Sequence, residues 1–177
     1  MRRLLVFSSF VLVAAGCSSG GSQPSRALPS GQATSVSRPP DAAIVPGGCG
    51  ATPIYKGYEP VWLDKAGALN NPRGLPYVLA VEETAAGFIF GYPLRAGHPT
   101  NPSNKILWVV GLPRNGSSLE ITGQLSGADV SSVHESEPAN SGPGEIYPSI
   151  VDVPQSGCWR FDLSWAGHRA ALYLQYQ

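Results

Sequence analysis

Short apolar runs separated by turn residues dominate the chain from about residue 47 onward. Proline and glycine interrupt it roughly every eight to twelve residues, and no segment keeps a 3.6-residue apolar spacing over three turns, which argues against long helices. The runs predict strands at 77–81, 88–92, 105–110, 118–125, 130–136, 158–165 and 169–176. About seven short antiparallel strands with turn signals between them favour an all-β fold, an immunoglobulin-like antiparallel β-sandwich.

Two connections look like hairpin turns. Residues 82–87 are turn-like and would join the strands at 77–81 and 88–92. The strand at 105–110 is nearly continuously apolar, which is typical of a central strand. Asn115-Gly116 follows it, and this pair suits a type I′ turn because both central residues take a positive φ. The pair therefore predicts a hairpin whose returning strand is 118–125.

The C-terminal stretch "GCWRFDLSW" separates by alternation into two faces. The apolar face must be buried, because exposing two tryptophans and a phenylalanine would create a large apolar patch. It comprises Trp159, Phe161, Leu163 and Trp165, and the next strand supplies Ala170, Leu172, Leu174 and Tyr176. The opposite face carries Cys158, Arg160, Asp162 and Ser164, where Arg160 and Asp162 are expected to form a surface ion pair.

Residues 1–16 have the pattern of an export signal. Arg2 and Arg3 precede an apolar run at 4–15, which is shorter than the roughly 20 residues that a membrane-spanning helix needs. Ala15-Gly16-Cys17, followed by serine and glycine, resembles the lipobox of bacterial lipoproteins, whose cysteine is acylated with fatty acids such as palmitate. The resemblance implies export, and attachment through Cys17 to the outer face of the bacterial cell membrane, because two or three acyl chains anchor a protein stably.

The mature chain is expected to have two parts. Residues 17–46 would be the lipidated Cys17 and a disordered tether of Ser, Gly and Pro, since this composition buries too little apolar surface to offset its ordering entropy. Residues 47–177 contain all four tryptophans and all seven tyrosines and have the size of one domain, the β-sandwich.

The charge of the chain bears on its binding partners, and its cysteine content bears on disulfide pairing. Without the signal, 10 basic and 12 acidic side chains remain, a formal net charge of −2, and no Lys/Arg cluster points to nucleic acid. Cys49 and Cys158 are the two cysteines left in a compartment that permits disulfides, so one bridge is the simplest pairing. Two free or metal-bound thiols are the alternative, although no CxxC or HxxxH spacing accompanies them.

Candidate chemistry is sparse. His98, His134 and His168 lie far apart in the sequence, and a metal site or a general base would require them to converge with a carboxylate. A G-x-S-x-G elbow and a phosphate-binding loop are both missing, so we expect no catalytic residues, no metal and no cofactor.

A binding role fits the sequence better. The long segment "GYPLRAGHPTNPSNK" brings Tyr92, Arg95, His98 and Lys105 onto one loop between two strands, and loops on a rigid sandwich commonly carry recognition. Tyr55, Tyr58 and Trp62 suggest a second possibility, an aromatic platform for sugar rings, but the same residues suit an edge strand with its packing contacts.

Two segments carry a further resemblance. "FGYPLRAGHPTNPSNKILWVV" and "YPSIVDVPQSGCWRFDLSWAGHRAALYLQY" are similar to a group of uncharacterised exported proteins and lipoproteins of Gram-positive bacteria, which share an "NKILWV" strand and a "YPS-I-x-x-P-x-x-GCW" segment. The resemblance implies location and fold class, and it implies that Tyr147-Pro148-Ser149 and Gly157-Cys158-Trp159 form one structural unit.

The sequence therefore predicts a membrane-anchored extracytoplasmic lipoprotein with a β-sandwich that binds an envelope component, either a cell-wall polymer or an envelope protein. One alternative is an envelope hydrolase or metal-dependent enzyme that uses His98, His134 or His168. Another is a structural accessory of an envelope or transport complex.

Overall fold

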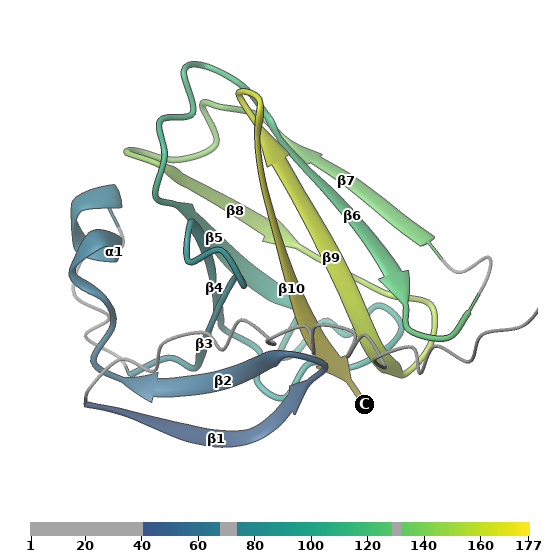
Figure 1. The fold of residues 1–177 in the computed structure, drawn as a ribbon. Coiled ribbons are helices and arrows are strands. Elements are labelled where there is room, and N and C mark those ends of the chain that lie inside the picture. The colour runs from purple at the N-terminus through teal and green to yellow at the C-terminus, as the bar shows by residue number, and fades with distance from the viewer. Residues whose placement is uncertain (1–40, 68–73, 129–131) are drawn as a thin grey trace, which may run out of the picture. The chain divides into compact units, whose positions relative to one another are not determined.

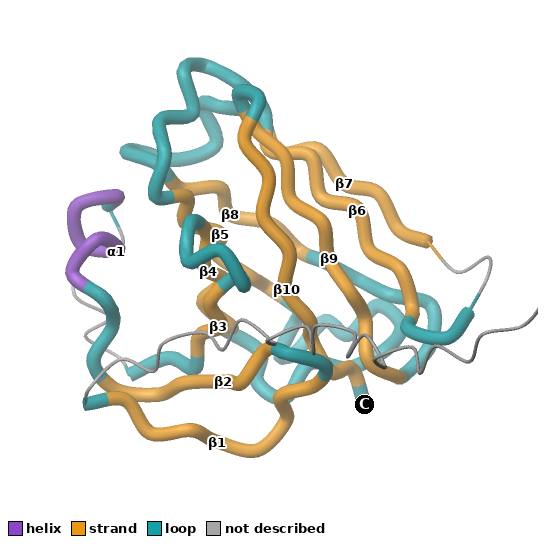
Figure 2. Tube along the Cα trace, viewed as in Figure 1, coloured by secondary structure: helices purple, strands orange, loops and turns teal. Residues whose placement is uncertain are grey.

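The computed structural model describes residues 41–67, 74–128 and 132–177, which form two antiparallel sheets and one short helix (Figures 1 and 2). The six-stranded sheet has the order β1 (Ala42–Cys49), β2 (Thr52–Gly57), β3 (Tyr77–Leu79), β4 (Ala85–Ile89), β5 (Lys105–Val110) and β8 (Ile146–Ile150). The four-stranded sheet has the order β10 (His168–Tyr176), β9 (Gly157–Trp165), β6 (Leu119–Leu125) and β7 (Ser132–Glu137). The all-β, sandwich-like prediction is confirmed, but with ten strands among the described residues where about seven were expected.

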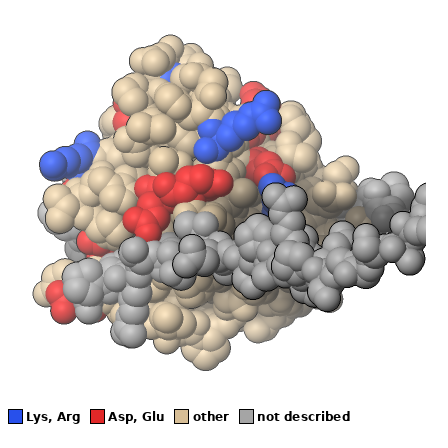
Figure 3. All heavy atoms as spheres, in the orientation of Figure 1, with Lys and Arg blue, Asp and Glu red and all other residues tan. Residues whose placement is uncertain are grey.

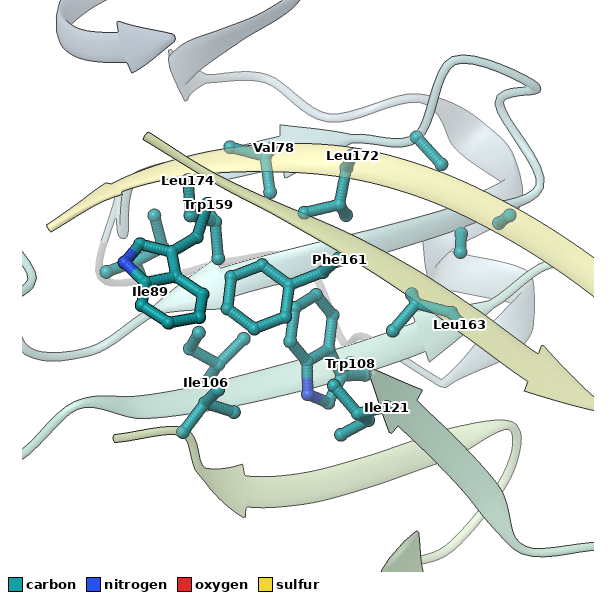
Figure 4. Close-up of a cluster of buried hydrophobic side chains, with 14 of the residues drawn as sticks. Val78, Ile89, Ile106, Trp108, Ile121, Trp159, Phe161, Leu163, Leu172 and Leu174 are labelled. Carbon is teal, nitrogen blue, oxygen red and sulfur yellow. The ribbon is translucent and has the colours of Figure 1, made fainter. Parts of the chain in front are cut away.

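The main core lies between the two sheets, and Figure 4 shows its aromatic centre. The rings of Trp108 and Phe161 are 6.4 Å apart, and those of Phe161 and Tyr176 are 6.2 Å apart. The apolar face predicted for the two C-terminal strands is confirmed, because all eight of its residues are buried: Trp159, Phe161, Leu163, Trp165, Ala170, Leu172, Leu174 and Tyr176.

A second apolar cluster covers the other face of the six-stranded sheet. Helix α1 (Val61–Ala66) contributes Leu63 and Ala66, which pack with Tyr55, Tyr77 and Phe88 of the strands. The central strands are therefore buried on both faces, which explains why all five residues of β4 are buried.

The predicted hairpin at Asn115-Gly116 is wrong. Both residues have positive φ values, 49° and 76°, so the tight turn is present. However, β5 pairs with β4 and β8, whereas β6 pairs with β7 and β9 in the other sheet. The turn thus carries the chain from one sheet to the other, because the local turn chemistry does not determine which sheet the next strand joins.

Other predicted boundaries also change, and the strand expected at 77–81 ends at Leu79 as β3. Strand β1 begins at Ala42, where residues up to 46 were assigned to the tether, because this segment pairs with β2 and Ala42 is fully buried. Strand β4 begins at Ala85 and ends at Ile89, so part of the expected turn is strand and part of the expected strand 88–92 is loop. The export signal, Cys17 and most of the tether lie outside the described residues.

The predicted disulfide joins Cys49 to Cys158, with the Cα atoms 5.8 Å apart and a sequence separation of 109. Cys158 is half-buried at the start of β9, on the same side as exposed Arg160 and Asp162. The alternation predicts this outer position of Cys158, and the bridge fastens the tip of the β1–β2 hairpin to the four-stranded sheet. Next to it, the backbone N–H of Tyr173 donates to Thr52 Oγ1 at 2.9 Å.

No helix in the described part of the chain has the length and apolar character needed to cross a bilayer.

Candidate functional site

The loop between β4 and β5 is held in place by backbone hydrogen bonds to the C-terminal end of the chain. The Ala96 N–H donates to the Gln177 carbonyl at 2.8 Å, and the Gln177 N–H donates to the Leu94 carbonyl at 3.0 Å. Farther along the loop, the Gly97 N–H donates to the Val153 carbonyl at 2.8 Å. Because these bonds join the loop to the residue after β10 and to the segment after β8, the loop is part of the rigid frame.

Asn104 lies at the centre of this loop and is only 1% exposed. Its amide Nδ2 donates to the Arg95 carbonyl at 2.7 Å and to Asp152 Oδ1 at 2.8 Å, while its Oδ1 accepts from the Arg95 N–H at 3.0 Å. One buried amide therefore connects both ends of the loop to the 151–153 segment.

Asp152 continues the network to His98. Asp152 Oδ2 lies 2.8 Å from His98 Nδ1, and the two side chains are 18% and 88% exposed. A carboxylate that accepts the Nδ1 proton fixes the orientation of the imidazole and leaves the Nε2 lone pair of the neutral ring available. The Asn104, Asp152 and His98 series thus presents an oriented imidazole at the protein surface.

The other predicted binding residues lie around the same loop but differ in setting. Arg95 and Lys105 are exposed, and the Lys105 ammonium lies 5.0 Å from the centre of the Phe90 ring. Tyr92 is half-buried, and its hydroxyl donates to the Pro46 carbonyl of β1. Arg95, His98 and Lys105 are therefore available to a ligand, whereas Tyr92 attaches the loop to the edge strand.

Tyr176 lies beneath the loop and donates its hydroxyl to the Val151 carbonyl at 2.9 Å. Burial, and secondarily the negative charge of Asp152, raise the pKa of this phenol far above its usual value. The hydroxyl therefore stays a neutral donor that supports the 151–153 segment from below.

The remaining histidines do not join His98. His134 Nε2 lies 3.2 Å from Glu120 Oε2 on the outer face of β6 and β7, and the His168 ring lies 5.6 Å from the Trp165 ring after β9. Among the residues that the structure describes, no three His, Cys, Asp or Glu side chains are close enough to hold a metal ion.

The aromatic platform, the second possibility for Tyr55, Tyr58 and Trp62, does not form. Tyr55 is 1% exposed and packs in the cluster that includes α1, with its ring centre 5.6 Å from that of Tyr77. Tyr58 is 75% exposed, and Trp62 is half-buried against that cluster. The packing interpretation therefore holds for Tyr55 and Trp62.

Sequence reasoning missed Asn104 and the setting of Asp152, which looked like an ordinary strand-edge carboxylate. A signal for Asp152 exists in the sequence, because this residue stands between two valines, Val151 and Val153. The structure buries both valines. A lone carboxylate within an apolar segment requires a partner. Nothing local distinguishes Asn104 from the other asparagines of the loop, because its partners are 9 and 48 residues away.

Comparisons with protein-family models, with curated proteins and with solved structures found no match to this chain.

Proposed function

We propose that the protein is an exported lipoprotein, held by acylated Cys17 to the outer face of the bacterial cell membrane, whose β-sandwich binds an envelope component. The observation that supports binding is the Asn104 network, which fixes an exposed loop in one conformation. A loop that is ordered before binding loses little conformational entropy in the complex, so its contacts contribute more fully to affinity.

The exposed side chains of this loop favour an anionic ligand. Arg95 and Lys105 carry positive charge, His98 can carry it when protonated, and Asp152 is already paired. Guanidinium and ammonium groups are the usual partners of phosphates and carboxylates. The ligand that fits best is a phosphate-bearing cell-wall polymer.

The anchor is tested by metabolic labelling with a fatty acid. We expect the wild-type chain to incorporate label and to fractionate with membranes, and Cys17→Ser to lose both properties. Label retained by Cys17→Ser would exclude this anchor without affecting the binding proposal.

The binding role is tested by co-sedimentation of the full-length chain with purified cell walls, before and after acid extraction of phosphate polymers. Replacing Arg95 and Lys105 together by glutamine should weaken binding by roughly tenfold or more, because two charge-assisted contacts are lost. The matched control replaces two exposed lysines elsewhere, Lys56 and Lys65, by glutamine and should bind like the wild type. Equal binding by the loop variant, or to extracted walls, would refute the proposed ligand.

An envelope hydrolase is the second candidate, because the Asp152–His98 pair has the arrangement in which a carboxylate orients a general base. This candidate predicts that the wild-type chain releases soluble fragments from cell walls and that His98→Gln does not. Absence of released fragments with the wild-type chain would exclude it.

A further inference from the structure

The outer face of the four-stranded sheet is hollowed in two adjoining places. One hollow has a volume of about 310 Å³ and is lined by Glu82, Thr122, Arg160, Asp162, Arg169 and Ala171, among others. The second has a volume of about 420 Å³ and shares Arg160, with Gln124 and Tyr173 nearby. Because Arg160 of β9 lines both hollows, they adjoin at this side chain on the face of β6, β9 and β10, and together they make a trough. We call it the β9 trough.

Side-chain size explains why the sheet is hollow here. Ala171 lies opposite Asp162, with Arg169 and Tyr173 two residues away on the same face of β10. On the other side of β9, Asp162 is paired with Thr122. Thr122, Asp162 and Ala171 thus form a row of shorter side chains across the three strands. The depression lies over this row, because the longer side chains of Arg169 and Tyr173 stand on either side of it.

One wall of the trough comes from outside the sheet. The turn between β3 and β4 crosses the edge of β10, where the Val81 N–H donates to the Ala171 carbonyl at 3.0 Å. Glu82 Oε2 accepts from the Ala171 N–H at 3.1 Å. Glu82 is therefore fixed beside the hollow, and its carboxylate retains acceptor sites for a ligand.

The other end of the trough is equally rigid. A Cβ added to Gly50 would approach the Tyr173 ring to 2.6 Å, so the tip of the β1–β2 hairpin lies directly on this ring. The adjacent Cys49–Cys158 bridge fixes that tip. Tyr173 is thus held in place by the hairpin while part of it lines the trough.

The charges in the trough are balanced and interspersed. Arg160 Nη2 lies 2.7 Å from Asp162 Oδ1, both side chains are about half-exposed, and Glu82 and Arg169 add one charge of each sign. On the face seen in Figure 3, acidic and basic side chains lie beside each other. A polyanion or polycation would meet repulsive groups here, whereas a neutral ligand rich in hydroxyl groups would find alternating donors and acceptors.

We propose that the β9 trough binds a saccharide chain. Sugar hydroxyls accept from guanidinium groups and donate to carboxylates, and the apolar face of a sugar ring packs on an aromatic side chain such as Tyr173. The fixed walls of the trough reduce the entropic cost of binding. This site is separate from the loop 91–105 and independent of the lipid anchor.

The test is an NMR and calorimetric titration of the full-length chain with a tetramer of N-acetylglucosamine, with maltotetraose, and with a tetrapeptide of two alanines, one glutamate and one lysine, which has no net charge. We expect at least one saccharide to bind and to shift the amide signals of Arg160, Asp162 and Ala171. Ala171→Gln should weaken that binding about tenfold or more by filling the hollow while leaving the Arg160–Asp162 pair intact.

Ser136→Gln is the matched control, because it places the same side chain on an exposed position of β7 on the same sheet face, outside the trough. It should bind the saccharide like the wild type, as should the double variant of Arg95 and Lys105. Failure of both saccharides to bind, equal binding by Ala171→Gln, or preferential binding of the tetrapeptide would each overturn the proposal. Because a trough that binds wall glycan would itself retain extracted walls, the wall-binding experiment with the loop variants is repeated in the Ala171→Gln background, where only the loop 91–105 contributes.

Discussion

Asn104 shows how one side chain organises a functional surface. Its amide makes three hydrogen bonds within a buried space, two to the backbone of Arg95 and one to Asp152. An isosteric carboxylate would place a negative charge next to Asp152, and an apolar side chain would leave three polar groups without partners. Asparagine is therefore the residue type that this position requires.

Replacing Asn104 by leucine should destabilise the fold by roughly 2–4 kcal/mol, since several polar groups lose their partner in a buried setting. Urea unfolding measures the loss, and hydrogen exchange at the Ala96 and Gly97 amides should accelerate because the loop detaches. Thr100→Ala, at an exposed position of the same loop, serves as the control and should leave both measurements unchanged. A neutral Asn104→Leu would mean that the loop is held by its backbone bonds alone.

Trp159 gives a residue-scale test of the core. Its side chain is fully buried, and its Nε1 donates to the Gln155 carbonyl at 3.0 Å. Trp159→Ala should cost about 3–5 kcal/mol because it leaves a large cavity between the sheets. Trp159→Phe, which keeps most of the apolar volume, should cost clearly less in the same chemical unfolding measurement.

Among the elements, β10 shows how a C-terminal edge strand is protected. Three segments bond to the edge of β10 and the residue after it: Thr52 of β2, the turn carrying Glu82, and Leu94 of the loop. An edge covered in this way is not available to pair with another chain. The same contacts place the loop, the hairpin and the trough on one strand.

Removing the disulfide should loosen one element more than the others. Replacing Cys49 and Cys158 by serine opens a loop of 109 residues, and the chain-entropy model gives about 4–5 kcal/mol at most for its closure. We expect the amides of β1 and β2 to exchange faster than those of β9, because the hairpin tip loses its attachment. Wild-type protein under reducing conditions should behave like the double variant, and uniform acceleration in all strands would contradict the local role.

The sequence predicted some strands far better than others. Strands β5, β9 and β10 were located to within one residue because their apolar runs are long or alternate strictly. Strands β1 and β8 were missed, and β2 was suggested only as an edge strand around Tyr55, whereas it lies between β1 and β3. Each of the three contains a proline: Pro46, Pro53 and Pro148. Proline argues against a central strand, but β1 and β8 are the two edges of their sheet and Pro53 is the second residue of β2.

At the scale of the whole molecule, two different sequence patterns each predicted one feature correctly. Alternation identified the buried face of the C-terminal hairpin, and the cysteine count identified the disulfide. Neither kind of pattern specifies which sheet receives a strand after a tight turn, as Asn115-Gly116 shows, because that choice depends on contacts with distant segments. The network of Asn104, Asp152 and His98 was missed for the same reason.

Three buried tyrosine hydroxyls connect distant parts of the fold. Each donates to a backbone carbonyl: Tyr77 to Tyr58 at 2.7 Å, Tyr147 to Ser117 at 2.8 Å, and Tyr176 to Val151 at 2.9 Å. The first bond joins β3 to the segment before α1, and the second joins β8 to the segment that crosses between the sheets. The third joins β10 to the segment that supports the loop. Burial is the main cause that raises the pKa of all three phenols above the usual value of about 10.

These shifts predict that the protein loses stability in alkali. Because the pKa of each phenol is higher in the folded state than in the unfolded state, the unfolded chain releases protons first as the pH rises. The contribution to stability is therefore complete below about pH 10 and declines above it, and urea unfolding between about pH 8 and about pH 11 should show this decline. Tyr176→Phe should be less stable than the wild type at about pH 8, because the bond to Val151 is lost, yet its stability should fall less steeply in alkali. Tyr58→Phe removes a phenol that is largely exposed, so as the control it should keep the wild-type slope of unfolding free energy against pH. If Tyr176→Phe also kept that slope, this phenol would not contribute to the alkaline loss of stability.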